Sequence, residues 1–255
     1  IMIKTFDNKE WKYIDIIKRM YDDDFYYGYL GSNALSSSSA KKLLQSPKAY
    51  LKSLNVNQDA QPLRDGRLVH LSVLEPQKVK DLTIIDGSKA TKAFKQAVLD
   101  LGSANVYTRS EFNNANRIAN AVLKCSEVTN LLQGAEFEVP QASMIEGIPF
   151  RGKADVLNGN VIIDLKTTGD ISKFRWSAKH FSYDLQAALY TRMFDADAFI
   201  FVVVDKDSKD IMICDCSDEF MRTGTEKLEM AIEQYKYFFQ DEIPNLDNYV
   251  THETL

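Results

Sequence analysis

The feature that most constrains the fold of this chain is a pair of apolar segments joined by a tight-turn signal. The segment Ile148–Val156 is followed by Asn158-Gly-Asn160 and then by Val161–Thr167. A glycine next to asparagine between two apolar runs favours a tight turn, so the two segments are predicted to pair as a β-hairpin. The apolar side chains of such a hairpin must be covered by other elements, which implies a sheet with packed layers.

Two carboxylates and a lysine lie on this predicted hairpin. Asp164 and Lys166 are two residues apart on the second strand, so their side chains share one face. The turn brings Asp155, near the end of the first strand, beside Asp164. Neighbouring carboxylates repel each other and are best tolerated around a hard divalent cation, usually Mg²⁺ where phosphate is present. The sequence therefore predicts a metal site for phosphate chemistry, with a surface ion pair as the simpler alternative.

The size and composition indicate a globular protein with a substantial core. The chain has 255 residues and a mass of 29.0 kDa, and 45% of its residues are hydrophobic. We expect one domain, mainly helical over residues 1–134 and containing the sheet over residues 135–255. No apolar stretch reaches the length of a membrane span and no signal-peptide pattern is present, so a cytosolic protein is expected. Cysteines 125, 214 and 216 lack metal-site spacing, and we expect buried free thiols.

The charge pattern bears on possible partners. A net charge of −5 argues against a protein that simply coats nucleic acid, but it does not exclude an enzyme that binds nucleic acid locally. Positive residues gather in four clusters, and for each cluster taken alone a solvated helix face is the simpler explanation. The clusters are Lys41, Lys42, Lys48 and Lys52; Arg64 and Arg67; Lys89, Lys92 and Lys95; and Lys173, Arg175 and Lys179.

Hydrophobic periodicity predicts the remaining elements. Helices are expected over Asn8–Tyr21, Ala40–Leu44 behind a capping serine, Pro47–Leu54, Gln61–Glu75, Ala90–Leu101, Ser110–Cys125, a short segment before Gly134, Ser172–His180, Tyr183–Phe194 and Glu219–Phe239. Strands are expected over Glu136–Met144, Ile148–Val156, Val161–Thr167, Ala198–Val204 and Ile211–Cys216, and an irregular loop over Phe25–Gly31. This order predicts an α/β (α+β) protein with a central mixed β-sheet flanked by helices.

Three further motifs accompany the hairpin. His70 lies on the predicted helix upstream, behind a serine-capped segment, while Gln186 and Tyr190 lie four residues apart on one face of a helix downstream. Together with Asp164-Leu-Lys166, these motifs resemble the PD-(D/E)XK nuclease superfamily. Within it, they resemble the exodeoxyribonuclease VIII (RecE-like) branch of phage recombination exonucleases, over about residues 28 to 204.

The resemblance implies a hydrolytic metal centre. Asp155 would be the central metal ligand and Asp164 the second acidic ligand. The side chain of Asp164 is shorter than that of the glutamate that the pattern also permits. The backbone carbonyl of Leu165 and the side chain of His70 would be additional metal ligands. One or two Mg²⁺ (or Mn²⁺) ions held there would neutralise charge and lower the pKa of water.

The resemblance also assigns roles beside the metal. Lys166 would orient or activate the attacking water and stabilise developing charge. Gln186 and Tyr190 would touch DNA or order the lysine. In isolation, His70 could be a core histidine, and Gln186 and Tyr190 a polar and aromatic helix surface. The roles of three further acidic residues stay open, namely Glu75, Glu136 and Glu138.

DNA contact is expected to be dominated by phosphate, since nothing in the sequence suggests base-specific reading. The expected contact residues are Lys41, Lys42, Arg64, Arg67, Arg151, Lys153, Lys173 and Arg175.

Three functions follow as hypotheses. The first is a 5′-to-3′ exonuclease on double-stranded DNA ends, which works with a single-strand annealing protein in a bacterial or phage-infected cell. By resemblance, it would form a ring-shaped trimer or tetramer. The second is a structure-specific or restriction-type endonuclease of the same superfamily. The third is a DNA-binding module that keeps the fold without catalysis. Strand polarity, subunit number, the partner and the number of metal ions are not fixed by the residues.

Overall fold

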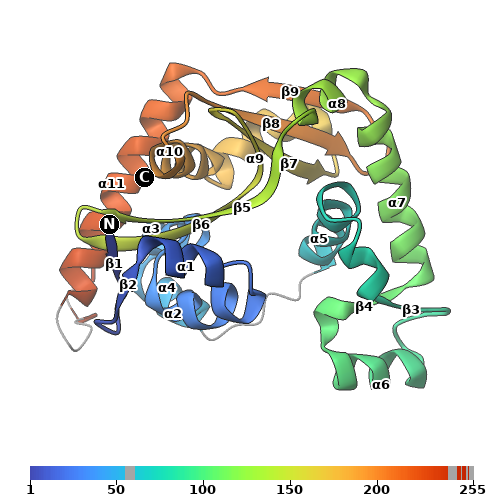
Figure 1. The fold of residues 1–255 in the computed structure, drawn as a ribbon, viewed down its shortest axis with the longest axis horizontal. Coiled ribbons are helices and arrows are strands. Elements are labelled where there is room, and N and C mark those ends of the chain that lie inside the picture. Colours follow the sequence, from blue (N-terminus) through green and yellow to red (C-terminus); the bar gives the residue numbers. More distant parts are fainter. Residues whose placement is uncertain (55–60, 241–245, 248, 251, 253–255) are drawn as a thin grey trace.

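A five-stranded mixed sheet forms the centre of the protein (Figure 1). The computed structural model describes residues 1–54, 61–240, 246–247, 249–250 and 252. The strands lie in chain order across the sheet, and β7 and β8 run parallel while the other neighbours are antiparallel. Their bounds are β5 Glu136–Ile145, β6 Ile148–Asn158, β7 Val161–Thr168, β8 Ala198–Asp205 and β9 Ile211–Asp215. The predicted mixed α/β architecture is thereby confirmed.

The helices are divided between the N-terminal part and the two faces of the sheet. They are α1 Tyr13–Arg19, α2 Leu30–Asn33, α3 Ser37–Gln45, α4 Pro47–Ser53, α5 Gln61–Leu74, α6 Lys92–Leu101, α7 Arg109–Lys124, α8 Ser126–Leu132, α9 Phe174–His180, α10 Tyr183–Phe194 and α11 Asp218–Phe239. Four short strands pair outside the main sheet: β1 Met2–Lys4 with β2 Glu10–Lys12, and β3 Thr83–Ile85 with β4 Val106–Thr108. These four strands were not predicted.

Alternate residues of β7 belong to two separate cores. Ile162 packs in the core that α3, α4, α9, α10 and α11 build on one face of the sheet. Ile163 and Leu165 pack in the core that α5, α7 and α8 build on the other face. Because strand side chains alternate, Asp164 and Lys166 lie on the same face as Ile162, toward α10.

The hairpin of β6 and β7 is present as predicted. Asn158 pairs with Val161 and Val156 pairs with Ile163. Gly159 turns the chain with φ of +56°, a conformation that costs glycine little. The hairpin therefore brings Asp155 and Asp164 into neighbouring positions on adjacent strands.

The N-terminal part differs from prediction in two places. The expected helix over Asn8–Tyr21 begins only at Tyr13, because Trp11 belongs to β2 and pairs with Ile3. The expected irregular loop over Phe25–Gly31 is instead a π-helix over Asp24–Tyr29 that leads into α2. Burial of Phe25 against Trp11, with ring centroids 5.3 Å apart, outweighs the local preference of the glycines there.

Two smaller expectations can be compared directly. Ser36 caps α3 through a reciprocal capping box with Ser39, which confirms the predicted serine cap. The three cysteines are free thiols as expected, although they are only partly buried. Among the residues described, no helix combines the length and apolar character needed to cross a membrane.

Candidate active site

Asp155 occupies the point at which β6 and β7 separate. Backbone pairing between these strands reaches Val156 and Ile163 and does not continue to Asp155. Beyond this point a side chain links the two strands, because Oδ2 of Asp155 accepts a hydrogen bond from the backbone amide of Leu165 at 2.8 Å. The carboxylate is therefore fixed by the backbone of the neighbouring strand.

Asp155 forms a candidate metal site with His70 and Glu138. One ligand atom from each of these residues lies within 4.8 Å of the others. The Nδ1 atom of His70, on α5, is 3.4 Å from Oδ2 of Asp155. An imidazole and two carboxylates at this spacing can hold one divalent cation. The structure thus brings the predicted site residues His70 and Asp155 together.

Glu138 is the site residue that the sequence left open. On β5, Phe137 pairs with Val156 and Val139 pairs with Ala154, so Glu138 lies opposite Asp155. A signal was available, because the tight turn at Glu146-Gly147 sets the register of β5 against β6. Counting back from that turn would have selected Glu138, whereas Glu136 is exposed.

The site is electrostatically crowded. Burial raises the pKa of Glu138 to about 8, and the nearby carboxylates of Asp155 and Glu75 add to the effect. Burial also raises the pKa of Asp155, where the influence of His70 opposes the shift and that of Asp164 reinforces it. A cation between these groups would relieve the repulsion.

Asp164, Lys166 and Gln186 form a second group on the α10 side of the sheet. The Lys166 ammonium is 2.5 Å from Oδ2 of Asp164 and donates to Oε1 of Gln186 at 3.3 Å. The Gln186 amide donates to Oδ1 of Asp164 at 2.7 Å. Gln186 therefore contacts both members of the ion pair.

Tyr190 lies one helical turn after Gln186 on α10, and its hydroxyl contacts β6. Its ring is 7% exposed, and its hydroxyl accepts a hydrogen bond from the backbone amide of Lys153 at 3.3 Å. The ring also packs closely over Gly152, where an added Cβ would lie 3.1 Å from it. Tyr190 therefore packs against β6 at Gly152 and Lys153, one turn of α10 beyond the residue that contacts Lys166.

Two predicted DNA contacts instead hold the N-terminal π-helix. Arg151 donates to the backbone carbonyl of Leu30 at 3.1 Å and lies over the ring of Tyr26. The Lys153 ammonium, whose side chain is 8% exposed, is 3.3 Å from Asp23. Both cations therefore have partners within the protein.

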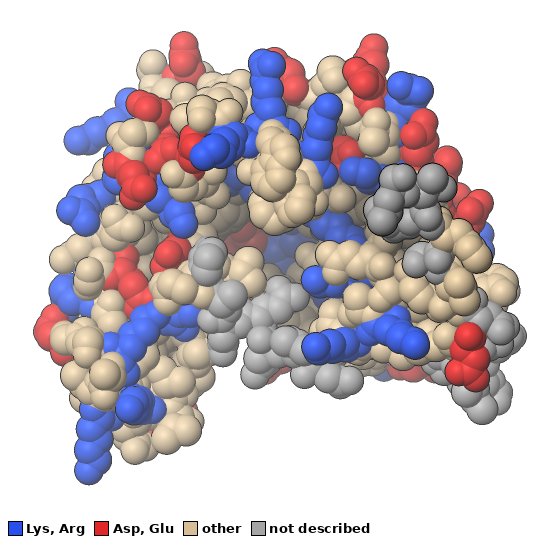
Figure 2. Space-filling model, turned by 180° about the vertical axis from the view of Figure 1, so that it is seen from behind, with Lys and Arg blue, Asp and Glu red and all other residues tan. Residues whose placement is uncertain are grey.

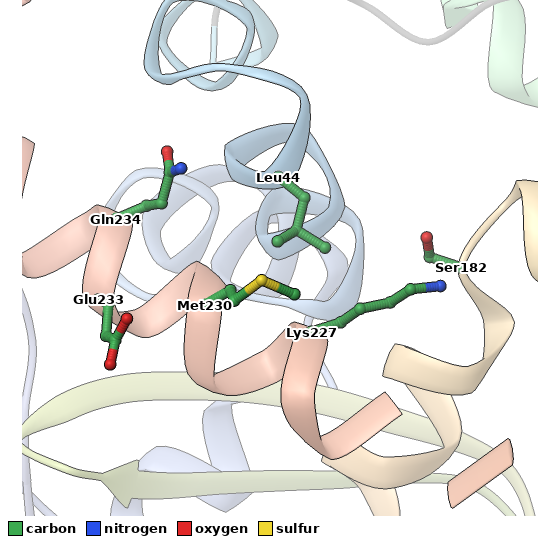
Figure 3. Close-up of a pocket in the computed structure, with 6 residues that line it drawn as sticks. All are labelled: Leu44, Ser182, Lys227, Met230, Glu233 and Gln234. Carbon is green, nitrogen blue, oxygen red and sulfur yellow. The ribbon is translucent and has the colours of Figure 1, made fainter. Parts of the chain in front are cut away.

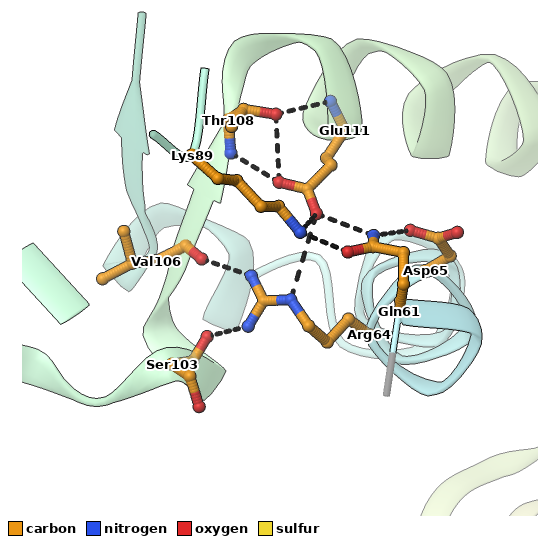
Figure 4. Close-up of polar contacts among 8 residues, drawn as sticks. All are labelled: Gln61, Arg64, Asp65, Lys89, Ser103, Val106, Thr108 and Glu111. Carbon is orange, nitrogen blue, oxygen red and sulfur yellow. Dashed lines mark hydrogen bonds and ion pairs between the residues drawn. The ribbon is translucent and has the colours of Figure 1, made fainter. Parts of the chain in front are cut away.

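Arg64 is also a structural residue (Figure 4). Its buried guanidinium donates to the carbonyls of Ser103 and Val106, and Nε is 3.9 Å from Glu111. Burial would raise the pKa of Glu111, but its hydrogen bonds, led by that from Lys89, lower it to about 2. This network ties α5 to the start of α7, so it positions the helix that carries His70.

The other predicted contacts differ in their exposure. Lys41 on α3 places its ammonium 5.0 Å from the ring centroid of Tyr183, and the Lys166 ammonium is 4.9 Å from the same centroid. Burial, with repulsion from Lys166, lowers the pKa of Lys41 to about 7. Lys42 is half-buried, and Arg67, Lys173 and Arg175 are exposed. Figure 2 shows one face of the molecule, which is hollowed at its centre with Lys and Arg side chains around the hollow.

A separate hollow of about 400 Å³ lies between α3, the start of α10 and α11 (Figure 3). Leu44, Ser182 and Lys227 line it together with residues of α11. The Lys227 ammonium is 2.7 Å from the buried Asp184. None of the three candidate metal ligands lines this hollow, so it is distinct from the site above.

Comparison with known proteins identifies the family. A model described as a PDDEXK-like domain of unknown function (DUF3799) matches residues 36–245. A solved structure from Eubacterium rectale, provisionally named an exonuclease, is 16% identical, with a TM-score of 0.65 over 92% of this chain and 95% of its own. A phage-related exonuclease from Haemophilus somnus 129PT is 17% identical, with a TM-score of 0.33 over 64% of this chain and 93% of its own. No curated protein matches the chain. The match to the family model covers most of the chain, which therefore belongs to the PDDEXK-like family DUF3799.

Proposed function

We propose that the protein is a metal-dependent deoxyribonuclease that hydrolyses phosphodiester bonds at the ends of double-stranded DNA. The observation that carries this proposal is the convergence of His70, Glu138 and Asp155 beside the Asp164–Lys166 pair. Ligands for a divalent cation and a fixed ammonium are the groups that hydrolysis of an anionic ester requires. The family description and the fold shared with a provisionally named exonuclease support the same activity.

The residues present fit a hard divalent cation. Carboxylate oxygens suit Mg²⁺ and Mn²⁺, and one imidazole nitrogen is compatible with Mn²⁺. The raised pKa values of Glu138 and Asp155 point the same way, because a positive charge would allow both to ionise. We propose His70, Glu138 and Asp155 as ligands, with Asp164 and the carbonyl of Leu165 as further ones. The observed contact of Leu165 is its amide, which donates to Asp155.

Lys166 supplies the protein's own positive charge. Burial alone would lower its pKa, but Asp164 and Asp155 outweigh burial and raise it, so the ammonium stays charged at neutral pH. A charged ammonium can bind a phosphate oxygen or donate to a water, but it cannot accept a proton. We therefore assign Lys166 to positioning and to stabilising charge in the transition state. A bound divalent cation would neutralise phosphate charge and lower the pKa of the attacking water.

The finer features of the proposal come from the family resemblance. They are 5′-to-3′ polarity, action with a single-strand annealing protein in phage-type recombination, and a ring-shaped trimer or tetramer. A ring would retain DNA topologically, which would compensate for the net charge of −5.

A linear duplex and a covalently closed circle, each offered with Mg²⁺, test the proposal. We expect the linear duplex to be degraded from its ends and the circle to stay intact. Cutting of the circle would replace the exonuclease with the endonuclease alternative. Failure to cut either substrate would favour a non-catalytic DNA-binding module. A duplex with one 5′ end blocked would then establish polarity.

A further inference from the structure

An exposed group of aromatic side chains lies on and just after α9. Trp176 is 63% exposed and Phe181 is 51% exposed, although both are large apolar residues. His180 lies one helical turn after Trp176, and the two rings stack with centroids 4.5 Å apart and planes 11° from parallel. The ring of Phe181 meets that of His180 edge-on at 4.9 Å. We call Trp176, His180 and Phe181 the aromatic ridge.

The ridge leads into the candidate active site. Phe181 and Tyr183 have ring centroids 6.1 Å apart, and the ring of Tyr183 lies 4.9 Å from the Lys166 ammonium. A continuous series of ring contacts therefore joins the exposed Trp176 to the lysine of the site. The ridge therefore ends one ring away from Lys166, whose side chain is 18% exposed.

Positive side chains are interleaved with these rings. Lys173, Arg175 and Lys179 are exposed on the same segment, and only Asp170, paired with Lys173 at 2.8 Å, offsets them among the contacts described. Aromatic rings accept bases of any sequence by stacking, while nearby cations bind the phosphates. This combination is typical of surfaces for single-stranded nucleic acid.

A second copy of the protein is a less suitable occupant. A two-fold contact across the ridge would bring the same three cations of both copies together, which is unfavourable. A polyanion with exposed bases satisfies both the rings and the charges.

We propose that the aromatic ridge stacks unpaired DNA bases, so that the protein engages a single-stranded segment next to the bond it cuts. The position of that bond rests on the proposed function, whereas the binding itself needs no hydrolysis.

Tryptophan content makes the binding measurable. The chain has two tryptophans, of which Trp11 is 7% exposed and Trp176 is exposed. A dT oligonucleotide of about 12 residues, in the range of single-strand site sizes, should quench the Trp176 emission in EDTA. Dye-labelled dT and a blunt duplex of equal length then give affinities for all variants by anisotropy.

We expect Trp176→Ala to weaken dT binding by about 10-fold or more, and Trp176→Phe to retain most of it. The blunt duplex should be affected much less. Tyr237→Ala is the matched control, because Tyr237 is 68% exposed on α11, away from the ridge, and should bind like the wild type. Because Trp176 is exposed, thermal unfolding of the variants should be unchanged.

Unchanged dT binding by Trp176→Ala would overturn the proposal, as would an equal loss for the dT oligonucleotide and the duplex. If Trp176→Ala lowered the mass of the protein measured by light scattering, the ridge would instead be a contact between copies of the chain. If dT binding depends on Trp176 but no DNA is cut with Mg²⁺, the ridge stands and the proposed nuclease fails. If DNA is cut but Trp176 has no influence on dT binding, the proposed nuclease stands and the role of the ridge fails.

Discussion

At Glu138 the backbone adopts a left-handed conformation, with φ of +52°, that is uncommon for a residue with a side chain. The residue lies within β5 and opposite Asp155, where the surrounding strand pairs hold it. Strained conformations persist where the structure around them is over-determined, and they are concentrated at functional sites. The strain at Glu138 therefore supports its assignment as a metal ligand.

The first prediction compares Glu138 with its neighbour Glu136 on the same strand. Glu138→Gln should weaken Mn²⁺ binding by about 10-fold or more, because the amide removes a charge from the ligand set. Glu136→Gln is the matched control and should leave the affinity unchanged, since Glu136 is exposed. Isothermal titration calorimetry measures both. Equal affinities for the two variants would remove Glu138 from the site.

The second prediction concerns pH in the metal-free protein. Burial raises the pKa of Glu138 from its ordinary value of 4.5 to about 8, so between these values the folded state binds more protons than the unfolded chain. The free energy of unfolding should therefore fall as pH rises through this window. In EDTA, the melting temperature of the wild type should fall more between about pH 5 and pH 8 than that of Glu138→Gln. Parallel pH profiles for the two proteins would contradict this prediction.

Residue chemistry was predictable where strand alternation determines it. Asp164 and Lys166 share a face because they are two residues apart on β7, and Gln186 reaches both from α10. Whether a positive side chain is exposed or paired within the protein was less predictable. Arg64 and Lys153 look like Arg67 in the sequence, but their partners come from distant segments that the sequence does not reveal.

At the scale of elements, the long periodic segments were predictable and the short ones were not. The long helix α11 and the central strands follow clear periodicity, whereas a three-residue strand such as β3 carries too few residues to show a pattern. β3 pairs with β4, and the carbonyl of Val106 in β4 accepts a hydrogen bond from Arg64, whose network holds α5.

The third prediction concerns that network. Arg64→Met should lower the free energy of unfolding by about 2 kcal/mol, because buried carbonyls lose a charged donor. It should also weaken metal binding, since α5 carries His70. Arg67→Met, on the same helix but exposed, is the control and should keep wild-type stability in urea unfolding. If the two variants were equally stable, the structural role of Arg64 would be wrong.

On the scale of the whole molecule, the separation of β6 and β7 places candidate site residues from several regions around one point. α5 brings His70 from one face of the sheet, while α10 brings Gln186 to the other face. The side shown in Figure 2 is hollowed, which gives the molecule a concave surface. Such convergence depends on the packing of distant segments, so only the hairpin part of the site could be derived from local sequence.

The fourth prediction is the assembly state. If the proposed ring forms, light scattering should give a mass three or four times the 29.0 kDa of one chain. The mass should persist in high salt if apolar contacts hold the ring. A strict monomer at all concentrations would count against the ring and leave the active-site assignment untouched.

The most direct measurement of the central claim is nucleotide release from a linear duplex by the wild type, Asp155→Asn and Lys166→Met. Asparagine can still accept the hydrogen bond from Leu165, so the fold should be retained while a metal ligand is lost. We predict that release by the wild type needs Mg²⁺ and stops in EDTA. Release by both variants should be slower by at least about 100-fold. Equal rates in the three proteins, or wild-type release that continues in EDTA, would contradict a metal-dependent active site at Asp155 and Lys166.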